Sequence, residues 1–585
     1  MSSVAVARPR TRSLSWRIHL RRPSPVMLCF LISLVAYEAA AFFVCFHGDT
    51  GALAGDGVSR VEIANRVLFS RDPHLAAIGF VWSPIPELSL LPLVALKPIF
   101  PVLVTGALAG NIMSAVFMAG AAAVLLGVLT DLGLGRGLRW TLTAAFALNP
   151  MIVLYAANSM SEAYFLFFLL LVVRNLHLWL RSRETGRLVA TGFYLGFAYL
   201  TRYEAGAAAI AVTGVVGLAS FTAASGGLRR RLRPACIDSA IALVPFLTAF
   251  VVWAITSWLI TGVAFQQFTS QYGTEPQLKA KGLTPPSTLS QTLHLAEQGV
   301  HWMLALEPLL PLVVIACLVV VIRRRNWVAL GGPAVLAGVL AFMLYVHMTL
   351  QVLPALRYYI AAIPLAILLI AITLSPRPAV TPTPTPVGTW PDGLTASANA
   401  RSGAWRARLG GPLRIATVTV ALLAMAVAIP SAGGALINPN IAGSVNGPAA
   451  QALVTFGPLT SAEKQAELTF VVDRQVSVYV DSLHLRPGSV LIDDFLGYVI
   501  EMASDDPTQY VITSDLDFQQ ILADPAANGV QYVLIPPPIG LGNLDAINRA
   551  YPGAYATGKG IGTLVRTFID YSSKAINWRL YRVAT

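Results

Sequence analysis

Apolar segments that recur from about residue 25 to residue 430 constrain the fold of this chain more than any other feature. Each is close to the length of about 20 residues that an α-helix needs to cross a bilayer, and short polar or Gly/Pro-rich joints separate them. In hydrocarbon a backbone must satisfy its own hydrogen bonds, so these segments are expected to be helices. The chain is 55% hydrophobic and only 12% charged, against roughly 25% for a soluble domain, which excludes a soluble protein.

Arginine clusters lie in the joints and predict how the chain is threaded. They precede the first segment and recur near residues 136, 181, 229, 323 and 401. Positive residues collect on the cytoplasmic side, so the net charge of +12 is explained by membrane orientation rather than by nucleic-acid binding. Placing every cluster in the cytoplasm gives about eleven spans, each near the bilayer thickness: 26–46, 106–130, 138–156, 161–180, 188–201, 204–222, 236–261, 303–322, 328–349, 356–374 and 412–432.

The N-terminus is interpreted as a basic cytoplasmic segment, 1–25, before a retained first span, because no small-residue cleavage pattern follows the apolar stretch. Segment 84–104 contains five prolines and is interpreted as a broken or re-entrant piece. A Thr-Pro run lies in 375–411, which predicts an unstructured cytoplasmic linker between the membrane domain, 26–374, and the last span.

Composition changes after the last span, and 433–585 is predicted to be an extracytoplasmic α/β domain. Short β-branched runs at 489–492, 510–512 and 531–535 indicate buried strands, and 517–522 and 544–551 indicate helices. Four aspartates of this domain are interpreted as strand-end and helix-capping residues rather than as a catalytic or calcium cluster: Asp493, Asp494, Asp515 and Asp517.

The first external loop, 47–83, has the pattern of an interfacial amphipathic helix, with apolar residues at helical spacing and charged residues on the other faces. Asp56 lies just before this helix. Its carboxylate is placed to accept a proton from an incoming hydroxyl, but this loop alone favours a helix-capping role, since aspartate is a preferred N-cap residue. Both roles remain open at this point.

The same loop continues to His74 and Trp82. Asp49, Asp56, Asp72 and His74 do not have the spacing of a known metal motif, so no metal site is predicted and a role for Mg²⁺ or Mn²⁺ is left open. The four cysteines lie in or beside apolar spans and indicate no disulfide framework.

Three charged residues lie at the outer ends of spans, opposite the arginine-rich face: Glu162, Arg202 and Arg357. Any one of them alone is explained by snorkelling to the headgroups. Three on one side favour a shared polar cavity, because ionisable groups in a membrane usually face a cavity or each other. Two guanidinium groups in such a cavity are suited to bind a phosphate.

These residues give the chain a resemblance to the GT-C class of integral-membrane glycosyltransferases, over about residues 1–375. The resemblance rests on Asp56 ahead of an interfacial helix and on four later motifs: Asn149-Pro150, Ser161-Glu162, Leu200-Thr201-Arg202 and Arg357-Tyr358-Tyr359 leading to Pro364. Many relatives place a second carboxylate beside the first, whereas Gly57 and Val58 follow Asp56 here.

The resemblance implies a polytopic helical enzyme that transfers a sugar from a polyprenyl-phosphate donor, in the manner of mannosyl- or arabinosyltransferases. Asp56 is implied as the general base and Arg357, Arg202 and Tyr358 as ligands of the donor phosphate. The cavity is implied to include Glu162, Arg60, Glu204, Trp82 and His74. The external loop 262–302 is implied to be a flap over donor or acceptor.

The expected setting is the outer face of a bacterial plasma membrane, with a glycan, lipid or protein as acceptor. A multi-span transporter or flippase is the alternative, since it too has charges lining a cavity, but no paired repeat with broken helices is evident between the halves. In a third alternative the C-terminal domain does the work and the spans only anchor it, for which one span suffices.

Overall fold

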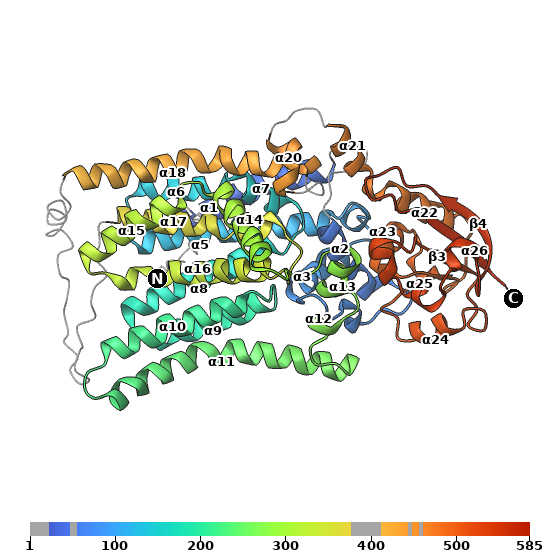
Figure 1. Cartoon of the computed structure of the whole chain (residues 1–585), viewed down its shortest axis with the longest axis horizontal. Coiled ribbons are helices and arrows are strands. Elements are labelled where there is room, and N and C mark those ends of the chain that lie inside the picture. Colours follow the sequence, from blue (N-terminus) through green and yellow to red (C-terminus); the bar gives the residue numbers. More distant parts are fainter. Residues whose placement is uncertain (1–22, 47–54, 376–410, 443–446, 455–459, 585) are drawn as a thin grey trace, which may run out of the picture.

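A helical bundle and a smaller α/β domain lie end to end in the computed structural model (Figure 1). The structure describes residues 23–46, 55–375, 411–442, 447–454 and 460–584. Segment 1–22, most of the linker 375–411 and residues 47–54, which include Asp49, lie outside the described residues.

Eight helices in the described part of the chain are long and apolar enough to cross a membrane, and two bent helix pairs bring the number to ten if each pair is one span. The chain is therefore a multi-pass membrane protein. The bundle helices are α1 (Pro25–Cys45), α5 (Leu108–Asp131), α6 (Arg136–Ala147), α7 (Pro150–Ala157), α8 (Glu162–Ser182), α9 (Thr185–Tyr199), α10 (Ala205–Ala223), α11 (Leu228–Thr261), α14 (Leu289–Leu306), α15 (Leu310–Arg324), α16 (Gly331–Met348), α17 (Ala362–Leu374) and α18 (Gly411–Ile437).

Three of the predicted spans differ in shape from the prediction. The span expected at 138–156 is two helices, α6 and α7, that meet at 59° where Pro150 begins α7. The span expected at 303–322 begins inside α14 and turns by 77° before α15, at Glu307 and Pro308. Proline has no amide hydrogen to donate, so the helix breaks at both places. The predicted span 188–201 is α9, with 15 residues shorter than a full crossing.

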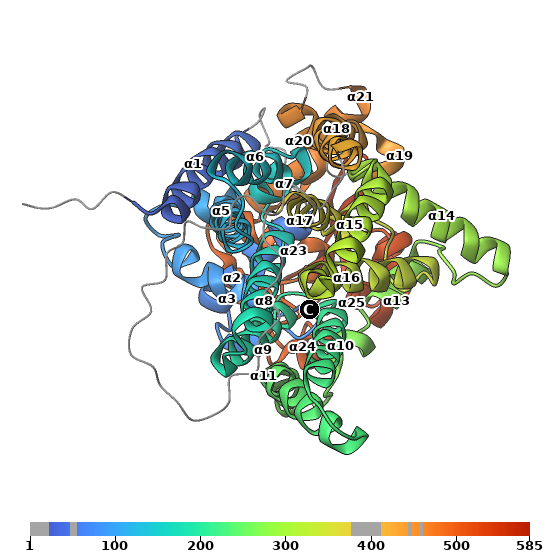
Figure 2. The ribbon, with the colours of Figure 1, turned by 90° about the vertical axis from the view of Figure 1, so that its left-hand side faces the viewer.

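Burial separates central helices from peripheral ones. In the span Leu356–Leu374, which ends in the central α17, 89% of the residues in the most apolar stretch are buried. In α11 the corresponding share is only 17%. Viewed along the bundle, α8, α16 and α17 lie inside and α1, α11, α14 and α18 lie outside (Figure 2). The outer helices present their apolar side chains to the surface, as lipid-facing helices do.

Short helices fill the junction between the bundle and the C-terminal domain (Figure 1). They are α2 (Gly55–Phe69), η1 (Leu75–Ile78), α3 (Ile85–Val94), α4 (Val102–Thr105), α12 (Gln266–Thr269) and α13 (Thr274–Ala280). The region 84–104 is thus two short helices. The expected helix of the first loop is α2, but it does not lie on the surface of the bundle, because the C-terminal domain covers it and both its apolar Val61 and its charged Glu62 are buried.

The C-terminal domain is α/β, as predicted, with one mixed five-stranded sheet of order β2-β1-β3-β5-β4. The three expected strands are β1 (Val490–Leu491), β2 (Tyr510–Val511) and β3 (Tyr532–Ile535), which pair in parallel. Two further strands, β4 (Gly562–Phe568) and β5 (Trp578–Val583), add an antiparallel edge that the sequence analysis missed. The main helices are α22 (Val471–Asp481), α23 (Asp494–Ala503), α24 (Phe518–Ala523) and α25 (Ala546–Ala550).

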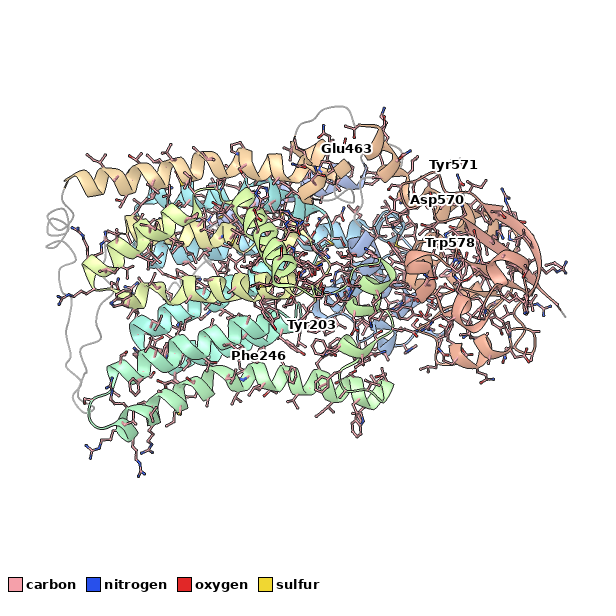
Figure 3. The ribbon with its side chains drawn as sticks, in the orientation of Figure 1. Tyr203, Phe246, Glu463, Asp570, Tyr571 and Trp578 are labelled. Atoms are coloured by element: carbon pink, nitrogen blue, oxygen red, sulfur yellow. The ribbon has the colours of Figure 1, made fainter. Side chains whose placement is uncertain are left out.

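Smaller helices complete the described chain. Between α18 and the domain lie α19 (Pro439–Ala442), α20 (Gly447–Val454) and α21 (Ser461–Glu467), and α26 (Ala554–Thr557) precedes β4. Single turns are η2 (Trp327–Leu330), η3 (Leu356–Tyr359), η4 (Leu468–Phe470), η5 (Pro507–Gln509) and η6 (Gly540–Leu544). Figure 3 shows Tyr203 at the end of the bundle nearest to the domain that carries Asp570 and Trp578.

Candidate active site

An ion pair joins the first loop to a span at the junction with the C-terminal domain. Arg357 Nη2 lies 2.8 Å from Asp56 Oδ2. Asp56 is in the first turn of α2, and Arg357 is in η3, the turn that leads into α17. Two residues 301 positions apart in the chain are thereby in direct contact, and both were expected in the site.

Glu162 connects this pair to a second arginine. Its Oε1 accepts a hydrogen bond from Arg202 Nη1 at 2.7 Å and lies 3.6 Å from Arg357 Nε. Arg202 also contacts Glu204, and both guanidinium groups lie over the ring of Tyr358, 5.5 and 5.4 Å from its centroid. Charged groups packed this closely can satisfy one another inside a membrane protein, so snorkelling does not describe them.

Arg60 forms a second layer from the same face of α2. It makes a buried ion pair with Glu87 of α3 and lies 4.5 Å from the centroid of the Trp82 ring. Its guanidinium also donates to the Ser161 hydroxyl, to which Arg202 donates as well. Glu87 was missed because the proline-rich apolar segment around it was interpreted only as a broken span.

Gly57 explains why Asp56 reaches this cluster. The start of α2 packs against the turn before α8, where the Ser159 hydroxyl donates to the Gly57 carbonyl at 2.9 Å. A Cβ on residue 57 would lie 2.3 Å from the Asn158 carbonyl oxygen, which no side chain tolerates. A second carboxylate directly after Asp56 is therefore excluded by packing. Asp56 also lies within the helix, which begins at Gly55, and not before it as expected.

The Asp56 carboxylate is both charged and reachable. Its side chain keeps 47% of its surface accessible, against 2% for Glu162. Burial raises the pKa of Asp56, but the charge and hydrogen bond of Arg357, with weaker contributions from Arg60 and Arg202, outweigh this and hold the pKa below its usual value. At neutral pH the group is an anion that a solute can approach.

The C-terminal domain adds groups that the sequence analysis did not identify. The Tyr498 hydroxyl lies 3.3 Å from the position that a Cβ of residue 55 would take, and its ring packs on Phe470. Lys574 Nζ lies 4.7 Å from the centroid of the Phe470 ring on the same side of α2. Burial lowers the pKa of Lys574, while the carboxylates of Asp473 and Asp56 oppose that shift, so this lysine and Asp56 are electrostatic neighbours.

Ion pairs attach the C-terminal domain to the end of α2. Arg66 pairs with Asp494, and Arg71 pairs with Asp515 and Asp517. The Tyr272 hydroxyl, from the loop expected to be a flap, donates to Asp493 Oδ2 at 2.9 Å. These contacts change the interpretation of the domain's aspartates, because they are docking residues as well as strand-end residues.

Capping is only part of their role. Asp493 does cap α23, accepting from the Phe495 amide at 2.8 Å. Asp517 occupies the capping position of α24 without a side-chain hydrogen bond to that helix and faces Arg71 instead.

His74 is the expected cavity residue that lies apart from the cluster. Its Nδ1 is 2.6 Å from the Asp72 carbonyl oxygen, at the start of η1, and none of its described contacts is with Asp56, Glu162 or the cluster arginines. The remaining expected residues, Arg60, Trp82, Glu162, Arg202, Glu204, Arg357 and Tyr358, form one connected network with Asp56.

A divalent cation does not fit the cluster as its residues stand. Asp56 and Glu162 each have an arginine as partner, and within the described residues no group of three or more His, Cys, Asp or Glu side chains is arranged to hold a metal ion.

Comparison with solved structures finds proteins of similar fold. Comparison of the sequence with family models and with curated proteins gives no match. ArnT from Cupriavidus metallidurans bound to undecaprenyl phosphate aligns with a TM-score of 0.52 and 14% identity, over 95% of this chain and 97% of that one. The same protein in the apo state gives 0.49 at 15% identity, over 95% and 97%. The archaeal oligosaccharyltransferase AglB from Archaeoglobus fulgidus gives 0.41 at 11% identity, over 86% and 69%. The GT-C-like fold expected from the sequence is confirmed.

Proposed function

We propose that this membrane protein is a glycosyltransferase that moves a sugar from a polyprenyl-phosphate donor to an acceptor hydroxyl at the end of the bundle that carries the C-terminal domain. The observation that carries the proposal is the pairing of an accessible carboxylate, Asp56, with Arg357, which shares Glu162 with a second arginine, Arg202. The similar fold of ArnT, which was solved with undecaprenyl phosphate, supports a lipid phosphate as the ligand.

The proposed reaction needs few groups. The acceptor oxygen attacks the anomeric carbon, the bond from that carbon to the phosphate oxygen breaks, and the hydroxyl proton passes to Asp56. Arg357 and Arg202 hold the phosphate that leaves with the bonding electrons, since guanidinium matches phosphate oxygens in a bidentate way. Tyr358 lies beneath both guanidinium groups and keeps them in place.

The Asp56–Arg357 ion pair gives the base a way to be activated by the donor. While Arg357 is paired with it, Asp56 is a weak proton acceptor, because the arginine lowers its pKa. A phosphate that binds Arg357 draws its charge away and lets the pKa of Asp56 rise, which strengthens the base when substrate is present. The donor thereby prepares the group that completes its transfer.

We place the arginine-rich end of the bundle in the cytoplasm of a bacterial cell, which puts Asp56 and the C-terminal domain outside, where lipid-linked sugars meet cell-envelope acceptors. The sugar is a hexose or pentose such as mannose or arabinofuranose, and the acceptor is a glycan, lipid or protein. Tyr498 and Lys574 adjoin the Asp56 end of α2 and are placed to contact the acceptor.

The test is transfer from radiolabelled polyprenyl-phosphate sugars in membranes. Asp56→Asn is expected to reduce transfer by about 10²–10⁴-fold, the usual contribution of a general base, while donor binding persists. Arg357→Gln is expected to lose donor binding as well. Arg187→Gln, an exposed charge change outside the cluster, serves as the control that keeps wild-type transfer.

Equal transfer by wild type and Asp56→Asn removes Asp56 as the base. If no donor supports sugar transfer and the protein moves a lipid-linked or other anionic substrate across the membrane of proteoliposomes, the transporter alternative is favoured over the enzyme.

A further inference from the structure

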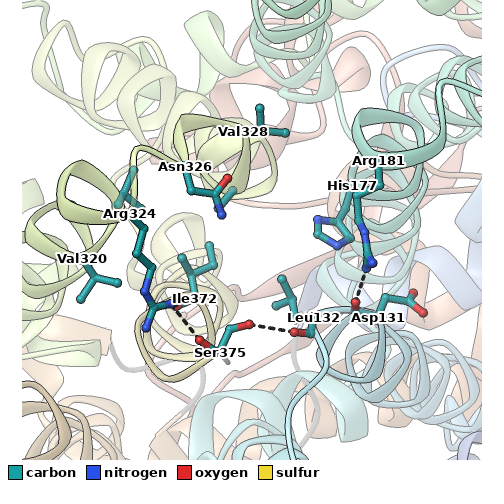
Figure 4. A pocket seen from close by; sticks show the side chains of 12 residues that line it. Asp131, Leu132, His177, Arg181, Val320, Arg324, Asn326, Val328, Ile372 and Ser375 are labelled. Carbon is teal, nitrogen blue, oxygen red and sulfur yellow. Dashed lines mark hydrogen bonds between the residues drawn. The ribbon is translucent and has the colours of Figure 1, made fainter. Parts of the chain in front are cut away.

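A polar pocket lies at the opposite end of the bundle from Asp56. It is formed where α5, α8, α15 and α17 end, and its cavity has a volume of about 30 Å³ and is partly open to solvent. Figure 4 shows Arg181 and His177 on one side of the pocket, Arg324 and Asn326 on another, and Asp131, Leu132 and Ser375 along its edge.

Two arginines of this pocket contact backbone carbonyl groups rather than carboxylates. Arg181 donates to the Asp131 carbonyl oxygen at 2.5 Å, and Arg324 donates to the Ser375 carbonyl oxygen at 2.8 Å. The carboxylate of Asp131 is taken by Arg174, at 2.9 Å. Within the described ranges neither pocket arginine has a carboxylate within ion-pair distance, so both keep a net positive charge and unused donors.

His177 adds a third polar group without a match. Its Nε2 is buried and has no hydrogen-bond partner among the described residues. A buried polar atom left without a partner costs free energy, so such an atom beside two cations indicates that a further group completes the pocket.

Neighbouring arginines show that snorkelling does not account for the geometry. Arg323 and Arg325 are exposed and point to the surroundings, as arginines at the end of a span do. Arg324, between them, is half-buried and turns toward the pocket and the end of α17. The end of α15 thus has two exposed arginines and one that turns inward, and only the inward one, Arg324, lines the pocket.

We propose that this pocket binds a phosphate group, presented by the headgroup of an anionic phospholipid or by a soluble phosphate compound, between the guanidinium groups of Arg181 and Arg324. Two planar guanidinium groups offer several donors to one phosphate, and basic pockets between spans are suited to anionic headgroups. His177, beside Arg181, and Asn326, beside Arg324, supply further polar groups. The site is separate from the proposed transfer reaction and does not depend on it.

The test is binding of phosphatidylglycerol, and in a parallel arm of inorganic phosphate, to the delipidated full-length protein in neutral detergent, measured by native mass spectrometry and by thermal unfolding. Arg181→Gln and Arg324→Gln are each expected to weaken binding by about tenfold, the usual effect of losing one charged hydrogen bond. Arg323→Gln removes the same charge from the exposed neighbour and is the matched control, expected to bind as wild type.

Loss in both pocket variants but not in the control supports the proposal, and the arm in which it occurs identifies the source of the phosphate. Equal binding by all four proteins, or binding that falls equally in the control, overturns it. The single variants are used because each leaves the other arginine's carbonyl contact in place, and the unfolding temperature without ligand verifies that each is folded.

Discussion

Arginines at the two ends of the bundle have different partners. At the Asp56 end they pair with carboxylates: Arg60 with Glu87, Arg202 with Glu162, Arg357 with Asp56, and Arg66 with Asp494. At the other end Arg181, Arg183, Arg231 and Arg324 donate to backbone carbonyls, and the carboxylate pairs there, Arg174 with Asp131 and Arg187 with Glu184, are partly exposed. Arginines paired with carboxylates form a preorganised polar site. Arginines bonded to backbone carbonyls keep a net positive charge that can attract anionic lipids and other anions.

The largest expected effect comes from removing a carboxylate that serves two arginines. Glu162→Gln leaves Arg202 and Arg357 without their shared partner, in a site where Glu162 is 2% exposed. We expect a loss of about 5 kcal/mol in the free energy of unfolding, the upper part of the range for a broken buried ion pair. Thermal unfolding in detergent measures it.

The matched variant at the other end is Asp131→Asn, whose partner Arg174 is 34% exposed. Its loss is expected to stay below about 1 kcal/mol, as for surface pairs. Similar losses in the free energy of unfolding for Glu162→Gln and Asp131→Asn would contradict the difference between the two ends.

Asp494→Asn tests whether the ion pairs at the Asp56 end also hold the C-terminal domain. The Arg66–Asp494 pair is nearly buried, at 13% and 5% exposure, so its loss is expected to cost about 3 kcal/mol. Cleavage of the domain from the bundle by a protease, followed over time, is the measurement. Asp517→Asn is the control, because its side chain is 45% exposed and Arg71 retains Asp515. Faster cleavage in the control than in Asp494→Asn contradicts the assignment.

The last expected effect is a pH dependence at the same junction. Burial raises the pKa of Glu62 to about 7 against the opposing charge of Arg66. The folded protein therefore holds this proton more tightly than the unfolded chain, and its contribution to stability is full below about pH 4.5 and lost as the pH rises to about 7, at up to about 1.4 kcal/mol per pH unit. Unfolding temperatures between pH 5 and pH 8 should flatten in Glu62→Gln; an unchanged slope assigns the dependence to other groups.

Orientation explains how much of the site was predictable. Asp56, Glu162, Arg202 and Arg357 were all found as charges at one face, because membrane spans leave few places for them. Lys574 and the pairing of Asp494 with Arg66 were not predicted, since contacts such as Arg66–Asp494 join residues 428 positions apart and leave no local pattern. Glu87 was missed for a different reason. It is a single carboxylate in a proline-rich segment whose residues have no helical periodicity that would place it on a particular face.

The fold shows the same division. Runs of apolar residues predicted the bundle helices, whose apolar side chains face one another or the lipid, and the three parallel strands, which are buried. Strand β4 has five consecutive exposed residues, so it offered no alternation to read. In β5 buried Trp578 and Leu580 alternate with the partly exposed Arg579, but buried Tyr581 directly after Leu580 interrupts the pattern.

Helix α2 carries Asp56, the proposed base, in its first turn and Arg66, which pairs with Asp494 of the C-terminal domain, near its last. Arg66 is ten positions after Asp56 in the helix, a rise of about 15 Å at 1.5 Å per residue. By thermodynamic linkage, whatever binds at Asp56 and shifts α2 must change the affinity of the domain for the bundle, and a partner that grips the domain must change binding at Asp56 by the same factor. A large acceptor bound to the domain would therefore change ligand binding at Asp56 before any atom of the acceptor contacts Asp56.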